Sequence, residues 1–157
     1  FEYYNFDAVT ISPYMGSDSI KPFLQDKSKG AYILCLTSNP SAKEFQYKFN
    51  ENSFLYQDVA KLASDLNIND NVGLVVGATN STKMQSIKKI DSSLTWLIPG
   101  IGFQGGDLKE SVKISNFNSI GIINVSRGII YSGNQSIDDI RISAMNYNDN
   151  INRYIYE

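Results

Sequence analysis

Apolar residues gather in five short runs along the chain, and polar or helix-patterned segments separate them. The runs cover residues 7–11 (DAVTI), 31–37 (AYILCLT), 72–77 (VGLVVG), 95–98 (TWLI) and 121–125 (GIINV). The second, third and fifth runs are almost continuously apolar and rich in β-branched residues, which is typical of strands covered on both faces in a parallel sheet. We therefore predict five strands, each ending in small or polar residues.

Segments with helical spacing lie between these strands. In residues 53–66, apolar side chains recur on one face of a helix. Similar spacing predicts helices after residues 80, 107 and 136, and a short helix before the second strand that Pro22 interrupts. Residues 41–52 are polar and aromatic, and we expect a loop or a short irregular helix there. The expected capping residues are Ser17 or Asp18, Ser53, Asn80 or Ser81, Asp107 and Ser136.

This alternation of strands and helices predicts an α/β fold with a parallel sheet. Two architectures fit the pattern, namely an open doubly wound sheet and part of a (β/α)8 barrel. A whole barrel has eight strands and typically about 250 residues. The sequence has 157 residues and five expected strands, so it supplies about five βα units of such a barrel.

The composition excludes several kinds of chemistry. Because the sequence contains no histidine, it cannot by itself supply a Ser-His-Asp triad, a Cys-His dyad or a histidine-ligated metal. The single cysteine, Cys35, lies inside an apolar run and is expected to be buried. A net charge of −2 gives no basic field for nucleic-acid binding. No apolar run reaches the roughly 18 residues of a membrane span, and the start lacks a signal-peptide pattern, so we expect neither nucleic acid nor a membrane as a partner.

A glycine-rich segment follows the fourth predicted strand. Residues 99–107 read PGIGFQGGD, which places several glycines and the amide of Gln104 between a strand end and a helix start. Glycines let the backbone approach an anion closely, and free N–H groups at the start of a helix favour phosphate. The alternative is a glycine-rich turn that binds no ligand.

A second polar segment follows the fifth strand. Residues 124–131 read NVSRGIIY, and Arg127 can hold a phosphate through two N–H groups. The alternative is a surface arginine paired with a helix carboxylate. Two such segments after successive strands match the phosphate site of (β/α)8 enzymes, which commonly follows strands seven and eight. Counting back makes residues 7–11 strand four, so we expect three N-terminal βα units to be absent from this sequence.

Two further polar segments follow other strands. Residues 37–40 (TSNP) suit a polar ring such as a pyrimidine, although the same residues can simply end a strand. Residues 10–16 (TISPYMG) are expected to line the floor of a site or a subunit interface, or to form a loop that packs Tyr14 and Met15. No lysine lies at a strand end beside two carboxylates. Solvated faces are expected for Lys21, Lys43, Lys61, Lys83, Lys88, Lys89 and Lys109.

These motifs, in this order, resemble the orotidine 5'-phosphate decarboxylase family. The matching segments are FDAVTISPYMGSDSIKPF, YILCLTSNPSAKEFQ, VGLVVGAT, LIPGIGFQGGDL and INVSRGIIY, within residues 6–131. The resemblance implies a (β/α)8 barrel that forms a homodimer, with its site at the strand C-termini. It also implies loss of CO2 from orotidine monophosphate to give uridine monophosphate (UMP) in pyrimidine synthesis, with no metal or organic cofactor.

The resemblance further assigns binding roles to particular residues. It implies a cytoplasmic carboxy-lyase that in some relatives is fused to orotate phosphoribosyltransferase. The implied phosphate-binding residues are Gln104, Arg127 and Ser126, and the implied pyrimidine-binding residues are Thr37, Ser38, Pro99 and Gln104.

The family's catalytic Asp and Lys residues, which follow a D-x-K-x-x-D pattern, have no match in this sequence. They belong to the three units expected to be absent, so we assign no catalytic residue to this chain and expect it to be inactive alone. Residues 1–157 are thus expected to be the C-terminal part of a single decarboxylase barrel domain. Phe103 stands where the family usually has alanine. The alternatives are another phosphate-binding barrel lyase or synthase, a non-catalytic nucleotide-phosphate binding module, and an unrelated doubly wound fold.

Overall fold

A computed structural model describes residues 1, 3–102 and 104–157. Its main feature is a five-stranded parallel sheet in the order β1-β2-β5-β6-β7. The strands are β1 (Ala8–Ile11), β2 (Gly30–Leu36), β5 (Val72–Val76), β6 (Thr95–Ile98) and β7 (Gly121–Ile123). All five predicted strands are confirmed, within one or two residues at each end.

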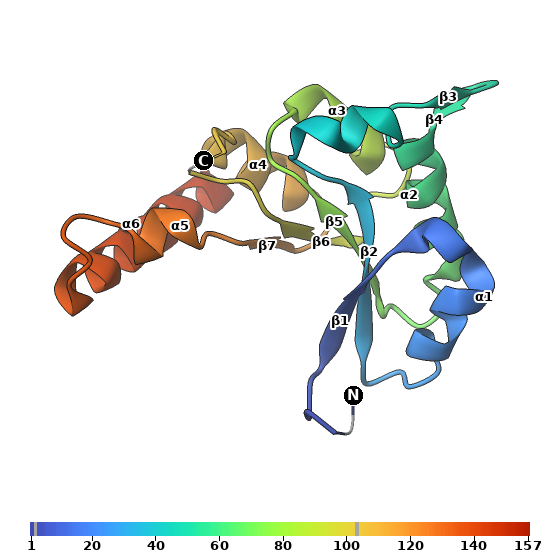
Figure 1. The fold of residues 1–157 in the computed structure, drawn as a ribbon, viewed down its shortest axis with the longest axis horizontal. Coiled ribbons are helices and arrows are strands. Elements are labelled where there is room, and N and C mark those ends of the chain that lie inside the picture. Colours follow the sequence, from blue (N-terminus) through green and yellow to red (C-terminus); the bar gives the residue numbers. More distant parts are fainter. Residues whose placement is uncertain (2, 103) are drawn as a thin grey trace.

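The strand order decides between the two expected architectures. A doubly wound sheet reverses its order at a switch point, whereas here each of the five strands pairs with the next one along the chain. The sheet curves, and helices cover its outer side in chain order (Figure 1). This singly wound arc is the arrangement found in part of a (β/α)8 barrel.

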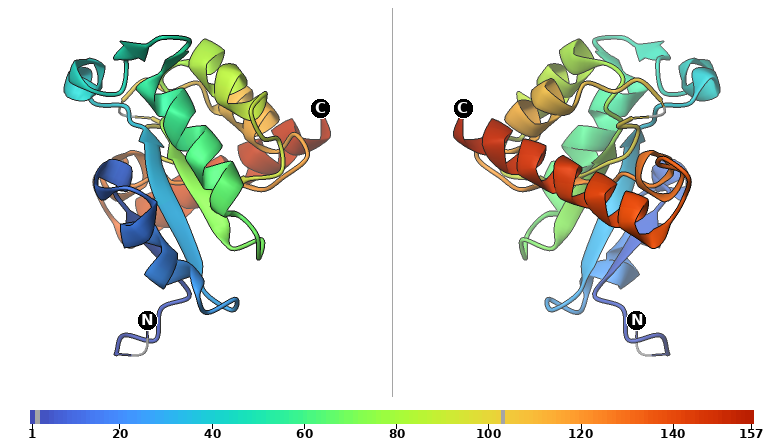
Figure 2. Two further views of the ribbon diagram at one scale, coloured as in Figure 1. Left: turned by 90° about the vertical axis from the view of Figure 1, so that its right-hand side faces the viewer. Right: turned by 90° about the vertical axis from the view of Figure 1, so that its left-hand side faces the viewer.

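The predicted helices occur in the predicted order, and the short helix α5 (Arg127–Ile130) was not predicted. The predicted helices are α1 (Ser17–Ile20), α2 (Leu55–Leu66), α3 (Ser81–Lys88), α4 (Leu108–Ser115) and α6 (Ile137–Tyr156). Three predicted caps are confirmed, because the side chains of Asn80, Asp107 and Ser136 accept hydrogen bonds from the backbone N–H groups of their helices. Figure 2 shows α6 lying across the side of the molecule formed by α4 and α5, with which it makes contact.

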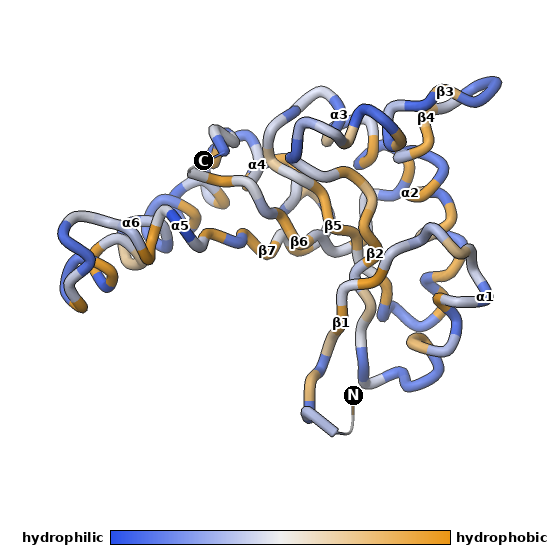
Figure 3. Tube along the Cα trace, in the orientation of Figure 1, coloured by the Kyte–Doolittle hydropathy of each residue, from blue (hydrophilic) through white to orange (hydrophobic). Residues whose placement is uncertain are grey.

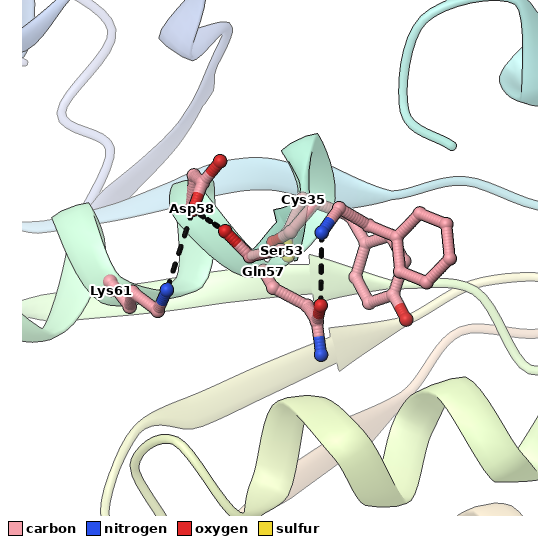
Figure 4. Close-up of polar contacts among 7 residues, drawn as sticks. Cys35, Ser53, Gln57, Asp58 and Lys61 are labelled. Atoms are coloured by element: carbon pink, nitrogen blue, oxygen red, sulfur yellow. Dashed lines mark hydrogen bonds and ion pairs between the residues drawn. The ribbon is translucent and has the colours of Figure 1, made fainter. Parts of the chain in front are cut away.

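The predicted cap at Ser53 is wrong. Helix α2 begins two residues later, at Leu55, because Ser53 pairs with Asn50 in a short antiparallel hairpin of β3 (Phe49–Asn50) and β4 (Ser53–Phe54). The Ser53 hydroxyl instead donates to Asp58, which also pairs with Lys61 at 3.4 Å (Figure 4).

Other local differences occur where the sequence carries a weak periodic signal. Helix α1 is capped by Gly16 rather than Ser17 or Asp18, and the predicted interruption near Pro22 is the change from α1 to the 3-10 helix Lys21–Leu24. Two more 3-10 helices cover Pro13–Met15 and Pro40–Glu44, and the second matches the irregular helix expected within residues 41–52.

The core lies between the sheet and the helices that cover it. All five residues of the central strand β5 are buried, whereas the edge strands β1 and β7 alternate between half-buried and exposed positions. Figure 3 shows the apolar residues concentrated along the strands. Cys35 is buried as predicted, and burial raises the pKa of its thiol to about 12.

Candidate functional site

Two segments that are distant in the sequence meet in one pocket at the carboxyl ends of β6 and β7. The pocket has a volume of about 170 Å³. Its lining residues are Pro99, Gly100, Ile101, Gln104, Asn124, Ser126 and Arg127. The two strands are hydrogen-bonded neighbours, and the Asn124 N–H donates to the Ile98 carbonyl at 2.9 Å. The structure therefore brings together four predicted site residues: Pro99, Gln104, Ser126 and Arg127.

The glycine-rich segment forms a closed loop at this pocket. The Gly106 N–H donates to the Gly100 carbonyl at 3.1 Å, and the Gly105 N–H donates to the Gly102 carbonyl at 2.9 Å. Gly100 has a φ of +100°, a backbone conformation that residues other than glycine rarely adopt. The glycines are thus needed for the shape of the loop that carries Gln104.

Ser38, two residues after the end of β2, lies against the Gly100 backbone next to this pocket, although it is not one of the lining residues. A Cβ atom on Gly100 would lie 2.5 Å from the Ser38 Oγ and 3.0 Å from the Gln104 Oε1. The Ser38 hydroxyl also lies against Gly77, so it is confined between two glycine backbones. It is buried and makes no hydrogen bond to any residue that the structure describes. A buried hydroxyl without a partner is energetically costly, which makes Ser38 a candidate for ligand contact.

The structure does not bring Thr37 to this pocket. Successive side chains of an extended segment point to opposite sides, and Thr37 faces away from Ser38. Its backbone N–H donates to the Gln46 Oε1 at 2.9 Å, while the Gln46 Nε2 donates to the Thr37 hydroxyl at 2.7 Å. The Thr37 hydroxyl in turn donates to the Asn39 Oδ1 at 2.5 Å.

Thr37 and Gln46 line a different and larger cavity, of about 540 Å³. Ser12, Pro13 and Tyr14 also line it, which is where the structure places the predicted segment 10–16. Tyr14 is 88% exposed and Met15 is 79% exposed. The alternative expectation, a loop that packs Tyr14 and Met15, is therefore wrong. Both side chains are instead in contact with solvent.

Asn124 is a lining residue that sequence reasoning did not single out. It lies at the end of β7, two residues before Ser126, and its exposed side chain adds an amide to the pocket. Its position just after a strand is the signal that could have identified it. Arg127 is the charged residue of this lining, and it is exposed, so the pocket has a positive end suited to an anion. Phe103 lies outside the described residues.

Lys88 contradicts the expectation that it lies on a solvated face. It is buried where α3 ends, and its ammonium donates to the Ser115 carbonyl at 3.1 Å and to the Ser119 hydroxyl. The same group lies 4.7 Å from the centre of the Trp96 ring. Burial lowers the pKa of Lys88 to about 8, and the charge of Asp91 offsets part of this effect. Lys88 also lines a cavity of about 780 Å³ between α3 and α4.

Neither a metal cluster nor a membrane-spanning helix occurs among the described residues. Within residues 1, 3–102 and 104–157, no three His, Cys, Asp or Glu side chains gather as metal ligands would. No helix in that same part of the chain is both long enough and apolar enough to cross a membrane.

Known proteins resemble this chain in sequence and in structure. An orotidine 5'-phosphate decarboxylase of Dehalococcoides mccartyi is 44% identical over an alignment of 156 positions, which covers 94% of this chain and 58% of the relative. An orotidine 5'-phosphate decarboxylase of an Azoarcus species is 40% identical, over 98% of this chain and 59% of the relative. The chain thus spans a little under 60% of the length of these curated relatives.

The solved structures agree with the fold. The OMP decarboxylase of Leishmania donovani superposes with a TM-score of 0.89 at 36% identity, covering 100% of this chain and 60% of that protein. The UMP synthase of the same organism gives a TM-score of 0.87, covering 99% of this chain and 35% of that protein. The prediction that the chain supplies an arc of a (β/α)8 barrel is confirmed. A family model also matches residues 1–137, and the chain belongs to the Orotidine 5'-phosphate decarboxylase / HUMPS family.

Proposed function

We propose that this chain is the phosphate- and pyrimidine-binding part of an orotidine 5'-phosphate decarboxylase, a carboxy-lyase that converts orotidine monophosphate to UMP and CO2. One observation carries the proposal. Gln104, Ser126 and Arg127 line one pocket, and the Ser38 hydroxyl and the Gln104 amide both lie against the Gly100 backbone, in a chain that belongs to this family. A nucleotide needs such a pairing of an anion site with a neutral polar site.

Arg127, Gln104 and Ser126 would bind the phosphate. The guanidinium of Arg127 offers two N–H groups in the geometry that a phosphate accepts, and such charge-assisted bonds are stronger than neutral ones. Gln104 adds an amide from the opposite loop of the same pocket. The phosphate takes no part in bond breaking. Its contacts with these residues therefore supply binding energy away from the reacting carbon, and this energy favours the reactive arrangement of the substrate.

Ser38, Pro99 and Gln104 would bind the pyrimidine. A hydroxyl and an amide can both donate and accept hydrogen bonds, which suits the alternating donors and acceptors of a pyrimidine edge. Pro99 lines the same pocket and presents an apolar surface. Thr37, whose hydroxyl is bonded to Gln46 and Asn39, stays a prediction for this role.

The reaction itself needs catalytic lysine and aspartate side chains in a pattern that this sequence does not contain. When the bond between ring carbon six and the carboxylate breaks, CO2 leaves and the electron pair stays on the carbon, which then takes up a proton. A lysine held between aspartates can stabilise and protonate that carbanion. We propose that these side chains come from the part of the family's length that this chain does not span, and that residues 1–157 belong to one barrel domain with them.

Partners follow from the same proposal. A second copy of the protein would cover the apolar face at Tyr14 and Met15, giving a homodimer. The similarity to Leishmania donovani UMP synthase supports a fusion to orotate phosphoribosyltransferase. A cytoplasmic location stays a prediction.

The direct test uses the protein at its natural length. Orotidine monophosphate should release CO2 and yield UMP, and UMP should protect the protein from heat far better than a sugar phosphate. Arg127→Ala should weaken UMP binding by about 10- to 150-fold, because charge-assisted hydrogen bonds contribute about 1.5–3 kcal/mol. Arg141→Ala is the matched control, since Arg141 pairs with Asp138 on the exposed side of α6.

Two outcomes separate the alternatives. Better protection by the sugar phosphate, with no CO2 released, would indicate another phosphate-binding barrel lyase or synthase. Binding of UMP with no CO2 released would indicate a nucleotide-phosphate binding module.

A further inference from the structure

Helix α6 touches both loops of the proposed phosphate site. The Ser143 hydroxyl donates to the Gly128 carbonyl at 3.0 Å. One turn further along the helix, the Tyr147 hydroxyl lies 2.8 Å from where a Cβ atom on Gly102 would be, and 2.7 Å from where a Cβ on Gly128 would be. Gly102 belongs to the loop of Gln104, and Gly128 follows Arg127.

The Tyr147 hydroxyl therefore lies between the two loops. Residues four apart on a helix share one face, so Ser143 and Tyr147 act on the same side of α6. Gly128 has no positive φ, and its lack of a side chain is explained by the space that Tyr147 occupies rather than by backbone conformation. Tyr147 is partly buried against the core, which fixes the position of its ring.

We propose that Ser143 and Tyr147 are positioning residues that hold the Arg127 turn against the Gln104 loop, so that both side chains face one phosphate. This inference rests on the proposed function of the pocket. The loops come from different strands, and a grip that uses both needs their spacing held to within about 0.5 Å. A displacement of about 1 Å can cost much of the benefit of such positioning.

The sharpest test is a pair of substitutions at the contact between Gly128 and Tyr147. Gly128→Ala introduces a Cβ that meets the Tyr147 hydroxyl, so the two loops should move apart and the affinity for UMP should fall by about 10-fold, the upper part of the range for one lost hydrogen bond. Adding Tyr147→Phe removes the nearest atom that the new Cβ meets, and leaves the Val125 Cγ1 at 3.2 Å. The double variant should recover most of the lost affinity, whereas adding Tyr154→Phe, elsewhere on α6, should recover none.

Single variants complete the test. Ser143→Ala should weaken UMP binding by about 3- to 10-fold, because it removes a hydrogen bond to the Gly128 carbonyl. Tyr147→Phe alone should weaken it by about 2-fold, because it removes only the packing of the hydroxyl against Gly102 and Gly128. Ser19→Ala is the control for Ser143→Ala, because the Ser19 hydroxyl also donates to a backbone carbonyl, that of Gly16, but belongs to α1, on the other side of the molecule from α5 and α6 (Figure 1). Binding of uridine, which lacks the phosphate, should weaken much less than binding of UMP in every variant, and this difference separates phosphate positioning from a general loss of structure.

The outcomes can be told apart. Absence of UMP binding in the unsubstituted protein would overturn the proposed function and this inference together. If Arg127→Ala weakens binding but the Ser143 and Tyr147 variants do not, only the inference fails. Equal losses for UMP and uridine, or no recovery in the double variant, would also overturn it.

Discussion

Gly100 is the position at which a single methyl group should disturb the site most. It carries a φ of +100°, and a Cβ there would meet the Ser38 Oγ at 2.5 Å and the Gln104 Oε1 at 3.0 Å. Gly105, in the same loop, has a φ of +78°, but a Cβ atom there would have no neighbour within 4 Å, so it differs from Gly100 mainly in the lack of a close contact.

The expected cost of each alanine can be separated into two parts. Placing an L-residue at positive φ costs about 1–2 kcal/mol, and both variants carry this strain. Gly100→Ala adds an overlap with a confined hydroxyl, and overpacking of this kind costs about 1–3 kcal/mol. We therefore expect Gly100→Ala to lower the free energy of unfolding by about 2–5 kcal/mol, against about 1–2 kcal/mol for Gly105→Ala.

Urea unfolding of both variants and of the unsubstituted protein measures this difference. Adding Ser38→Ala to Gly100→Ala removes the nearest contacting atom, the Ser38 Oγ, and part of the stability should return. Equal destabilisation by Gly100→Ala and Gly105→Ala would refute the reasoning, because it would show that Ser38 does not lie against Gly100.

Three other predictions concern residues around the site and the core. Gln46→Leu should lower the free energy of unfolding by about 1–3 kcal/mol, since it removes two hydrogen bonds to Thr37; an unchanged urea midpoint would contradict this. Burial lowers the pKa of Lys88 to about 8 from 10.5. Between these two pH values the folded protein has lost the Lys88 proton while the unfolded protein still binds it, so the free energy of unfolding, measured relative to that of Lys88→Met, should rise as the pH increases from 8 towards 10.5. A gap between the two proteins that stays constant across this range would rule out the depressed pKa. The Cys35 thiol, buried and with its pKa raised to about 12, should react with a thiol reagent at about pH 8 only after unfolding, and rapid labelling of the native protein would show that it is accessible.

The sequence predicted those parts of the fold that depend on local chemistry. Three of the five strands were recognisable because their runs are almost continuously apolar, which is typical of strands in a parallel sheet. The caps at Asn80, Asp107 and Ser136 were recognisable because their side chains satisfy N–H groups within three residues.

What the sequence could not provide depends on contacts between distant segments. Ser53 is a good cap by residue type, but its pairing with Asn50 takes it out of the helix. Lys88 reads as a surface residue until Ser115 and Trp96 are seen to enclose its ammonium.

In the candidate site, too, some residues could be predicted from local sequence and others depend on contacts between distant segments. Gln104 and Arg127 stood out because glycine and small residues surround them after strands. Thr37 and Ser38 are neighbours of equal polarity, and only the direction of the extended backbone decides which one faces Gly100. Ser143 and Tyr147 lie on a helix far along the chain, and no local pattern marks their contact with the phosphate loops.

A crystal structure of the natural-length protein with UMP would test the central claim most directly. We expect the phosphate to lie within hydrogen-bond reach, about 2.7–3.2 Å, of both Gln104 and Arg127, with the pyrimidine edge at Ser38. A nucleotide bound elsewhere, or a phosphate that touches neither residue, would contradict it.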